Sequence, residues 1–409
     1  MGVAARIRWL AGAAALAAAW ALPAGGAASR TPGDAPLAIS FPTAQRGYVL
    51  SLASCGRAAC ATMSTTTDGG STWRPVTVPA PLRGGVVVPW LGDRETGSEP
   101  IAVHFADARD GWITAALSLP ATPSAPTGAV VFKMWSTHDA AASWTSIPLS
   151  RLDVGGGVIA MATHGPRTYL FGTSSRNDRT HVLVSPSTGD RWANAARFAL
   201  FQPAGGTALE GWFAFSGAQG WFVSGNDRYL ALERLARDGT WIRATTTSAA
   251  PGNASAAPLV PVAPGLLAIV AHTAGFVTPP TNSVPRDWND GATWLFTSRD
   301  GGRTFQPVRE LSASYQVTFP AIAGLPAIPR PGTILLVRDV GGASQLVRTT
   351  DWGARWRVVL HRAVSQVAFV SARVGYALTS PTASPLRATL LRTVDGGARW
   401  TSVALGSSG

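Results

Sequence analysis

The segment Thr393-Val-Asp395-Gly-Gly397-Ala-Arg399-Trp400 decides the fold, because its pattern recurs along the chain. The full pattern has Thr or Ser, an Asp two residues later, one or two small residues, and an aromatic residue five positions after the Asp. Five copies keep both the aspartate and the aromatic residue. They pair Asp68 with Trp73, Asp139 with Trp144, Asp300 with Phe305, Asp351 with Trp356, and Asp395 with Trp400. Two further copies end at Trp192 and Trp241, where Ser187 and Ala236 replace the aspartate, so the chain holds seven copies.

A second signal precedes the aspartate pattern in most copies, a glycine followed by an aromatic residue and an apolar strand. It occurs at Gly47-Tyr48, Gly111-Trp112, Gly220-Trp221 and Gly375-Tyr376. Each repeat therefore predicts four antiparallel strands, the last beginning at the aromatic residue of the aspartate pattern. Four strands repeated seven times predict an all-β fold, a seven-bladed β-propeller of four-stranded antiparallel blades. No strand is left over to be exchanged between the first and last blades, so we expect side-chain packing to close the ring.

The first residues differ from the rest of the chain. Arg6 and Arg8 precede an apolar run from Trp9 to Leu22, and small residues follow it. This is typical of a secretory signal peptide, so we predict a signal peptide at 1–28, a short linker at 29–36 and a single propeller at 37–409. No other stretch approaches eighteen apolar residues, so the mature chain is expected to lack a transmembrane segment. We predict a monomer that is secreted or extracytoplasmic, at the cell surface or in a periplasm.

The aspartate pattern resembles the Asp-box (BNR) repeat of sialidases, sortilin-type luminal domains, xyloglucanases and the photosystem II assembly-factor family. The resemblance covers nearly the whole mature chain. In such a turn an aspartate can accept backbone N–H bonds, a glycine permits positive φ, and the aromatic ring can pack between blades. We therefore expect the five aspartates to be structural. The repeat also distributes them around a ring, which does not suit paired catalytic carboxylates.

The two cysteines, Cys55 and Cys60, lie in one predicted hairpin. In an exported protein a disulfide that closes this loop is the favoured interpretation, and the alternative is a redox or metal pair. The spacing is not Cys-x-x-Cys, and the six histidines show no ligand pattern. His104 is expected to be a core histidine. We predict no metal site and no cofactor.

Long connections indicate where a ligand would bind. In this strand order they gather on the rim opposite the aspartate pattern, and long loops on a rigid scaffold commonly carry binding residues. Two of the loops combine arginine, acid and tryptophan, which suits sugars or protein partners; ordinary solvated loops are the alternative. The candidate binding residues are Arg83, Trp90, Asp93, Arg94, Glu95, Arg286, Asp287 and Trp288.

The chain is basic, with a formal net charge of +12 from 34 Lys and Arg against 22 Asp and Glu. Such a protein is attracted to acidic surfaces. Arg303, Arg355 and Arg399 occupy solvent-facing positions of the repeat, and Arg348 and Arg392 occupy equivalent positions on third strands. A stripe of this kind could hold an acidic partner, although a GC-rich genome would also produce an arginine bias. Nucleic acid is disfavoured by export and by the lack of lysine-rich segments.

Two functions follow from these observations. The first is a non-catalytic binding or scaffold propeller for a protein or an acidic cell-surface polymer, similar to the photosystem II assembly-factor family. The second, implied by the likeness to sialidases, is a glycoside hydrolase or a carbohydrate-binding propeller with a glycan as ligand. Tyr315 would then be the nucleophile and Glu210 its partner. The Arg-Ile-Pro signature expected for a sialidase is absent, because the first blade contains Ile39-Ser-Phe-Pro42.

Overall fold

The computed structural model describes most of the chain from Ala35 to Leu405. The segments outside the description are 1–34, 56–57, 84–100, 120–128, 175–179, 197–209, 226–228, 249–259, 264–265, 273–292, 313–325, 341–342, 380–381, 384–385 and 406–409. The predicted signal peptide and linker therefore lie almost entirely outside the described residues. No helix among the described residues is long and apolar enough to cross a membrane.

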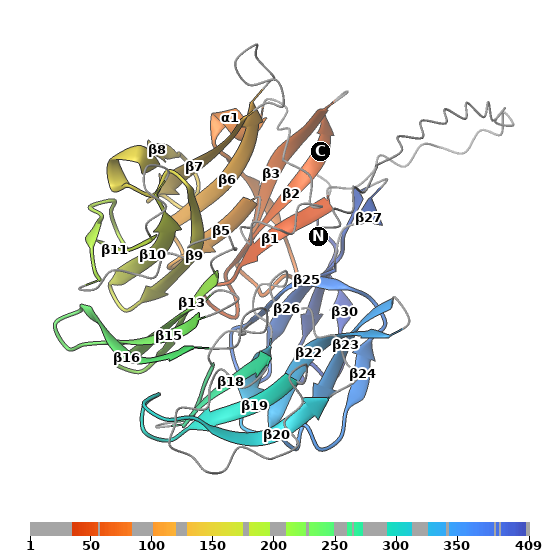
Figure 1. Ribbon diagram of the computed structural model, residues 1–409. Helices are drawn as coiled ribbons and strands as arrows, with labels where there is room; N and C mark the ends of the chain where they lie inside the picture. The colour runs from red at the N-terminus through yellow and green to blue at the C-terminus, as the bar shows by residue number, and fades with distance from the viewer. Residues whose placement is uncertain are drawn as a thin grey trace, which may run out of the picture. The chain divides into compact units, whose positions relative to one another are not determined.

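The fold is a seven-bladed β-propeller of four-stranded antiparallel sheets, as the repeat predicted. Figure 1 shows the strands following one another in chain order, from red β1 to blue β30. Blades 1 to 4 are β1 (Ala35–Ser40), β2 (Gly47–Cys55), β3 (Ala58–Thr66), β4 (Arg74–Val76); β5 (Ile101–Phe105), β6 (Gly111–Leu119), β7 (Ala129–Thr137), β8 (Thr145–Ile147); β9 (Gly157–His164), β10 (Arg167–Thr173), β11 (Thr180–Pro186), β12 (Ala193–Asn194); and β13 (Glu210–Ser216), β14 (Gln219–Gly225), β15 (Tyr229–Leu235), β16 (Trp241–Ser248).

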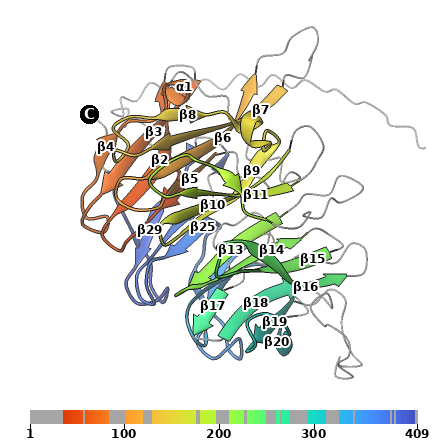
Figure 2. The ribbon, with the colours of Figure 1, turned by 90° about the vertical axis from the view of Figure 1, so that its left-hand side faces the viewer.

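Blades 5 to 7 follow the same order. They are β17 (Val260–Ala263), β18 (Leu266–His272), β19 (Thr293–Ser298), β20 (Gln306–Ser312); β21 (Ala327–Arg330), β22 (Thr333–Val340), β23 (Ala343–Thr349), β24 (Arg357–Leu360); and β25 (Val364–Phe369), β26 (Gly375–Thr379), β29 (Leu390–Thr393), β30 (Thr401–Ser402). A small hairpin, β27 (Thr382–Ala383) and β28 (Leu386–Arg387), lies between β26 and β29 in the chain. The short helix α1 (Ala80–Arg83) follows blade 1 and contacts β3 (Figure 2), and a 3₁₀ helix, η2 (Leu149–Leu152), follows blade 2.

The element boundaries differ slightly from the prediction. β1 begins at Ala35, two residues before the expected start of the propeller. Only in blade 4 does the fourth strand begin at the aromatic residue of the repeat, Trp241; in blade 1, for example, β4 begins one residue after Trp73. The aromatic residue therefore belongs mainly to the turn, and its ring packs into the hydrophobic cluster of a blade junction, as for Trp73, Trp144 and Trp400.

The core is divided among the blade interfaces, because every sheet is apolar on both faces and packs against two neighbours. The buried residues of the described chain form seven hydrophobic clusters, one at each junction between consecutive blades. The junction of blades 7 and 1, for example, buries Ile39 and Val49 against Tyr376, Leu378 and Leu390.

In five blades an aromatic residue of the second strand links that blade to the next; blades 5 and 6 have only aliphatic residues at that position. Tyr48 of β2 stacks on Phe105 of β5, with ring centroids 3.4 Å apart, and its hydroxyl donates to the carbonyl of Ala108 at 2.7 Å. Trp221 of β14 reaches blade 5 in the same way, its Nε1 donating to the carbonyl of Gly301 at 3.1 Å. The glycine before the aromatic residue makes room for a phenylalanine of its own blade. A Cβ at Gly375 would lie 2.7 Å from the ring of Phe369.

The ring closes between blades 7 and 1 without exchange of strands among the described residues. All four strands of blade 1 come from one end of the described chain, and all four of blade 7 from the other. β1 contacts β25, and the side-chain amide of Gln366 both donates to the carbonyl of Ile39 at 3.1 Å and accepts from its N–H at 2.9 Å. Side chains therefore close the ring, as the sequence predicted.

The turns around Asp68, Asp139, Asp300, Asp351 and Asp395, which we call the aspartate turns, share one arrangement. In the first, Asp68 Oδ1 accepts from the hydroxyl of Thr66 at 2.8 Å and from the N–H of Thr72 at 2.9 Å, and Oδ2 accepts from the hydroxyl of Thr72 at 2.6 Å. The Thr66 hydroxyl accepts from the N–H of Gly70 at 2.9 Å. Similar bonds from Ser143 and Thr137 lower the pKa of Asp139 to about 2. These carboxylates are ionised and occupied in holding their own turns.

The second aspartate turn is strained, because Ala140 has a φ of 63° where blades 1, 5 and 7 have glycine. A left-handed conformation costs a residue with a Cβ about 1–2 kcal/mol. We therefore expect Ala140→Gly to raise the free energy of unfolding by about 0.5–1 kcal/mol after the greater flexibility of unfolded glycine is subtracted. The neighbouring Ala142 is exposed and has no positive φ. Ala142→Gly is the matched control, and urea denaturation should show no gain for it; equal effects of the two changes would contradict the strain.

Candidate binding surfaces

The two rims of the propeller differ in what they carry. The turns between first and second strands and the turns between third and fourth strands lie on one rim, which we call the turn rim. They are joined by a repeated backbone bond, such as Gly69 N–H to the carbonyl of Gln45 at 2.9 Å and Gly396 N–H to that of Arg373 at 2.8 Å. The connections between blades and between second and third strands lie on the opposite rim.

Most of the candidate binding residues predicted from sequence are on segments outside the described residues. These are Trp90, Asp93, Arg94, Glu95, Arg286, Asp287, Trp288 and, for the glycosidase alternative, Tyr315. Glu210 begins β13, but its side chain is likewise outside the description. Arg83 ends α1, is exposed, and donates from Nε to the carbonyl of Val78 at 3.0 Å.

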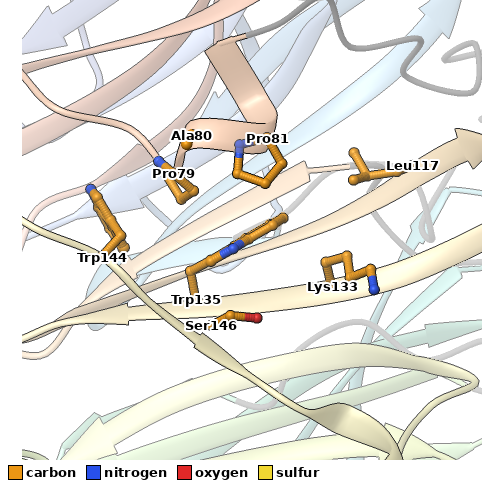
Figure 3. A pocket seen from close by; sticks show the side chains of 8 residues that line it. All are labelled: Pro79, Ala80, Pro81, Leu117, Lys133, Trp135, Trp144 and Ser146. Atoms are coloured by element: carbon orange, nitrogen blue, oxygen red, sulfur yellow. The ribbon is translucent and has the colours of Figure 1, made fainter.

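A pocket of about 310 Å³ lies beside α1, between the blade 1 to blade 2 connection and strands β6 to β8. Figure 3 shows the Trp135 ring extending across it between Trp144 and Lys133, with Pro79 and Pro81 on the α1 side. Trp144 is fixed by a bond from Nε1 to the carbonyl of Thr77 at 2.9 Å. Lys133, the single lysine of the chain, is exposed. The volume is at the lower end for ligand pockets, about 300–1,000 Å³. Aromatic walls with one ammonium suit a small ring-shaped ligand that carries a carboxylate.

Sequence reasoning did not find this pocket, although a signal was present. Lys133 and Trp135 alternate on one strand and therefore share a face of the sheet, and Trp144 is the aromatic residue of the next turn. What could not be seen was that α1 would lie beside this face.

The turn rim has opposite charge in the two halves of the ring. In blades 1 to 4 the described turns between strands carry four arginines and six aspartates: Arg46, Arg109, Arg191 and Arg237 with Asp68, Asp107, Asp110, Asp139, Asp190 and Asp238. In blades 5 to 7 they carry five arginines and three aspartates. The five arginines are Arg299, Arg303, Arg355, Arg373 and Arg399, all of them exposed, and we call this set the arginine rim.

The three aspartates within the arginine rim are already engaged. Asp300 Oδ1 accepts from the N–H groups of Arg303 and Thr304, both at 2.9 Å, and Asp395 Oδ1 accepts from the N–H of Arg399 at 3.0 Å. The backbones of Arg303 and Arg399 are thereby fixed while their side chains stay exposed. None of the five guanidinium groups forms a salt bridge with another part of the chain that the structure describes.

Two of the arginines predicted for a basic stripe have a different role. Arg348 is partly buried, and its Nε donates to the carbonyl of Gly396 in the next blade at 2.8 Å. Arg392 is also partly buried and approaches Gly69 of blade 1, where a Cβ would lie 3.3 Å from its Nη2. These two side chains join blades, and only Arg303, Arg355 and Arg399 of the predicted stripe are exposed.

The side chain of His104 connects blades 2 and 3. Nε2 of His104 shares a hydrogen bond of 2.8 Å with the hydroxyl of Thr163 in blade 3, and burial lowers the pKa of His104 to about 4. No cluster of three or more His, Cys, Asp or Glu side chains suited to a metal ion occurs among the described residues.

Both cysteines lie in the β2–β3 hairpin, where the register pairs Cys55 with Ala58 and Cys60 with Ala53. The disulfide between them stays a prediction.

Solved structures support the fold. The chain is similar to YCF48 bound to a D1 peptide, with a TM-score of 0.51 and 17% identity over 89% of this chain and 93% of that chain. It is similar to a PL25 ulvan lyase bound to -[GlcA(1-4)Rha3S]-, with a TM-score of 0.52 and 10% identity over 91% and 93%. The propeller domain of the Trilobed protease from Pyrococcus furiosus matches with a TM-score of 0.52 and 7% identity over 93% and 98%. At these identities the likeness shows a propeller and not an activity. Neither a protein-family model nor a curated protein matches the sequence.

Proposed function

We propose that this chain is an exported, non-catalytic binding propeller, built from Asp-box repeats, that holds an acidic segment of a partner protein on the arginine rim. The observation that carries the proposal is the set of five exposed arginines on fixed turns, with the nearby carboxylates occupied by backbone and hydroxyl donors. Guanidinium groups are suited to carboxylates because their donors can bind both oxygens.

Three further observations support the proposal. The N-terminal segment with Arg6, Arg8 and an apolar run is typical of export. The aspartate turns have the hydrogen bonds and positive φ expected of Asp-box repeats. YCF48, a propeller of similar fold, was solved with a D1 peptide bound, which makes peptide binding a role that such a ring can perform.

Charge reversal tests the proposal on the mature protein. The probe is a fluorescein-labelled deca-glutamate peptide, followed by fluorescence polarisation in moderate salt. Arg355→Glu combined with Arg399→Glu should weaken binding about tenfold or more, because each change removes an attraction and adds a repulsion. The matched control combines Arg46→Glu with Arg237→Glu, which alters the net charge equally on the other half of the same rim, and should change the affinity less than about twofold. Equal losses in the two variants would show that only net charge matters and would refute the arginine rim.

The pocket beside α1 favours carbohydrate binding as the second candidate, because Trp135, Trp144 and Lys133 line it. The same binding assay, with polygalacturonate as the probe, distinguishes carbohydrate binding from binding of an acidic peptide. If the polymer binds more tightly than the peptide, and Lys133→Ala weakens it while the arginine double variant does not, the ligand is a glycan and the peptide proposal fails.

A further inference from the structure

One junction of the ring contains a titratable bridge. His138, in the second aspartate turn, lies between two carboxylates of different blades. Its Nδ1 is 2.7 Å from Oδ1 of Asp110, in the β5–β6 turn of its own blade, and its Nε2 is 3.2 Å from Oδ2 of Asp190, in the β11–β12 turn of blade 3. Both ring nitrogens therefore face acceptors.

Asp190 is held from blade 2 by three donors. Besides His138, the hydroxyl of Ser136 donates to Oδ2 at 2.6 Å and Nε1 of Trp112 donates to Oδ1 at 3.1 Å. Ser136 and Trp112 are buried, and the Trp112 ring also meets Trp192 of blade 3 edge-on at 6.0 Å. The side chain of Asp190 thus reaches from blade 3 into blade 2, with His138 at its more exposed edge.

Protonation decides whether the bridge is complete. An imidazolium donates from both nitrogens, so it can hold Asp110 and Asp190 at once. A neutral imidazole donates from one nitrogen only, and the lone pair of the other would face a carboxylate oxygen. We propose that His138 is a pH-sensitive latch between blades 2 and 3: the protonated imidazole holds Asp110 and Asp190 together, and the neutral imidazole gives up its bond to Asp190, which then keeps only its bonds from Ser136 and Trp112.

The surrounding charges favour the protonated form. The charged side chains on the packed elements are Asp107, Arg109 and Asp110 on the β5–β6 turn, Asp139 beside the histidine, and Asp190 and Arg191 on blade 3. Burial alone would lower the pKa of His138, but the hydrogen bonds and charges of Asp110 and Asp190 outweigh burial and raise it above the ordinary value. Burial raises the pKa of Asp110, so this carboxylate takes up a proton more readily in acid and the bridge then loses one of its negative charges. A raised histidine pKa stabilises the folded junction below the ordinary value of about 6.5, and this stabilisation disappears as the pH rises through the folded pKa.

Among the described residues, the junction of blades 3 and 4 also holds a histidine, His164, which stacks on Phe215; burial lowers the pKa of His164, so a rise in pH does not loosen that contact. At three further junctions the corresponding bonds do not depend on pH. Tyr48, Trp221 and Tyr376 each donate to a backbone carbonyl of the next blade, and these groups do not change charge near neutral pH. A rise in pH should therefore loosen the ring specifically between blades 2 and 3.

Hydrogen exchange measured by mass spectrometry on the whole mature protein tests the latch at pH 6 and pH 8, with rates corrected for intrinsic exchange. Peptides that cover 136–145 and 185–194 should open several-fold more at pH 8, up to about tenfold for each unit by which folding raises the pKa of His138. Peptides that cover β22 and β23 serve as the internal reference and should not change.

Two variants identify the group responsible. His138→Gln should remove the pH difference at this junction, and Asp190→Asn should reduce it, because an amide keeps acceptor capacity for Trp112 without the charge. His361→Gln, at an exposed histidine, is the matched control and should leave the difference intact. A pH difference that persists in His138→Gln, or that is equal in all seven blades, would overturn the latch.

Discussion

Replacement of Tyr376 by alanine is expected to lower the free energy of unfolding by about 3–5 kcal/mol, the range for removing a large buried aromatic side chain. Tyr376 has 0% exposure and stacks on Phe41 of blade 1, with ring centroids 3.5 Å apart and planes 7° apart. Its hydroxyl donates to the carbonyl of Gly69 at 3.0 Å. The side chain therefore packs the one junction that the chain must form between its two ends.

The conservative variant separates packing from hydrogen bonding at this junction. Tyr376→Phe keeps the ring and should cost about 1 kcal/mol, the net value of one hydrogen bond. Urea denaturation gives both free energies, and hydrogen exchange should show faster opening of β1 and β26 in the alanine variant than in the phenylalanine variant. A loss in Tyr376→Ala no larger than that in Tyr376→Phe would mean that the stacking does not hold the ring closed.

The fold could be predicted because five of the seven blades use the same turn chemistry and the other two keep its aromatic residue. Asp68, Asp300 and Asp395 stand in the same frame, and each frame ends in an aromatic residue that packs at a blade junction. A single copy would indicate only a turn, but seven copies separated by strand patterns leave few other folds. The phenylalanine that lies over the glycine before the aromatic residue in four blades was not predicted, because it comes from the end of a first strand with a weak sequence pattern.

The functional surfaces could be predicted only in part, because they depend on contacts between blades. The Arg348 position was predicted to be part of a basic surface stripe, yet the neighbouring turn lies against its side chain. Asp190 stands in a copy whose repeat aspartate is replaced by Ser187, so nothing in the repeat pointed to its bond with His138. Residues that break a repeat carry no periodic signal, and their partners are visible only in the folded ring.

A buried acid in blade 4 was also missed. Glu233 of β15 has 0% exposure and faces Arg243 of β16 in register, with Oε1 3.1 Å from the Arg243 Nε. Phe222 pairs with Glu233 from the other side, so the carboxyl group lies among apolar residues of the blade 3 to blade 4 junction. Burial raises the pKa of Glu233 to about 8, against the opposing attraction of Arg243. Glu and Arg on paired strands are a common surface pattern, so nothing in the sequence indicated that Glu233 is buried.

The raised pKa of Glu233 has a direct consequence for stability. An unfolded glutamate ionises near pH 4.3, whereas the folded one keeps its proton up to about pH 8, so folding binds a proton throughout this interval. Its contribution is favourable below about pH 4.3 and is lost progressively as the pH rises to about 8. Glu233→Gln has nearly the same volume and does not ionise. We therefore expect Glu233→Gln to raise the free energy of unfolding at pH 9 by about 2–4 kcal/mol. Linkage alone would give about 1.36 kcal/mol for each unit by which folding raises the pKa of Glu233, and relaxation of the site reduces that total.

Urea denaturation of wild type and variant at pH 5 and pH 9 measures this effect. The difference between the two proteins should be small at pH 5 and large at pH 9, and comparing the two proteins at each pH cancels the contribution of His138, which weakens over the same interval. Arg243→Met should act in the opposite direction, destabilising the protein more at pH 9, because it leaves the carboxylate without its nearest cation. If Glu233→Gln is instead less stable than wild type at both pH values, Glu233 is ionised in the folded protein and its pair with Arg243 stabilises the junction of blades 3 and 4.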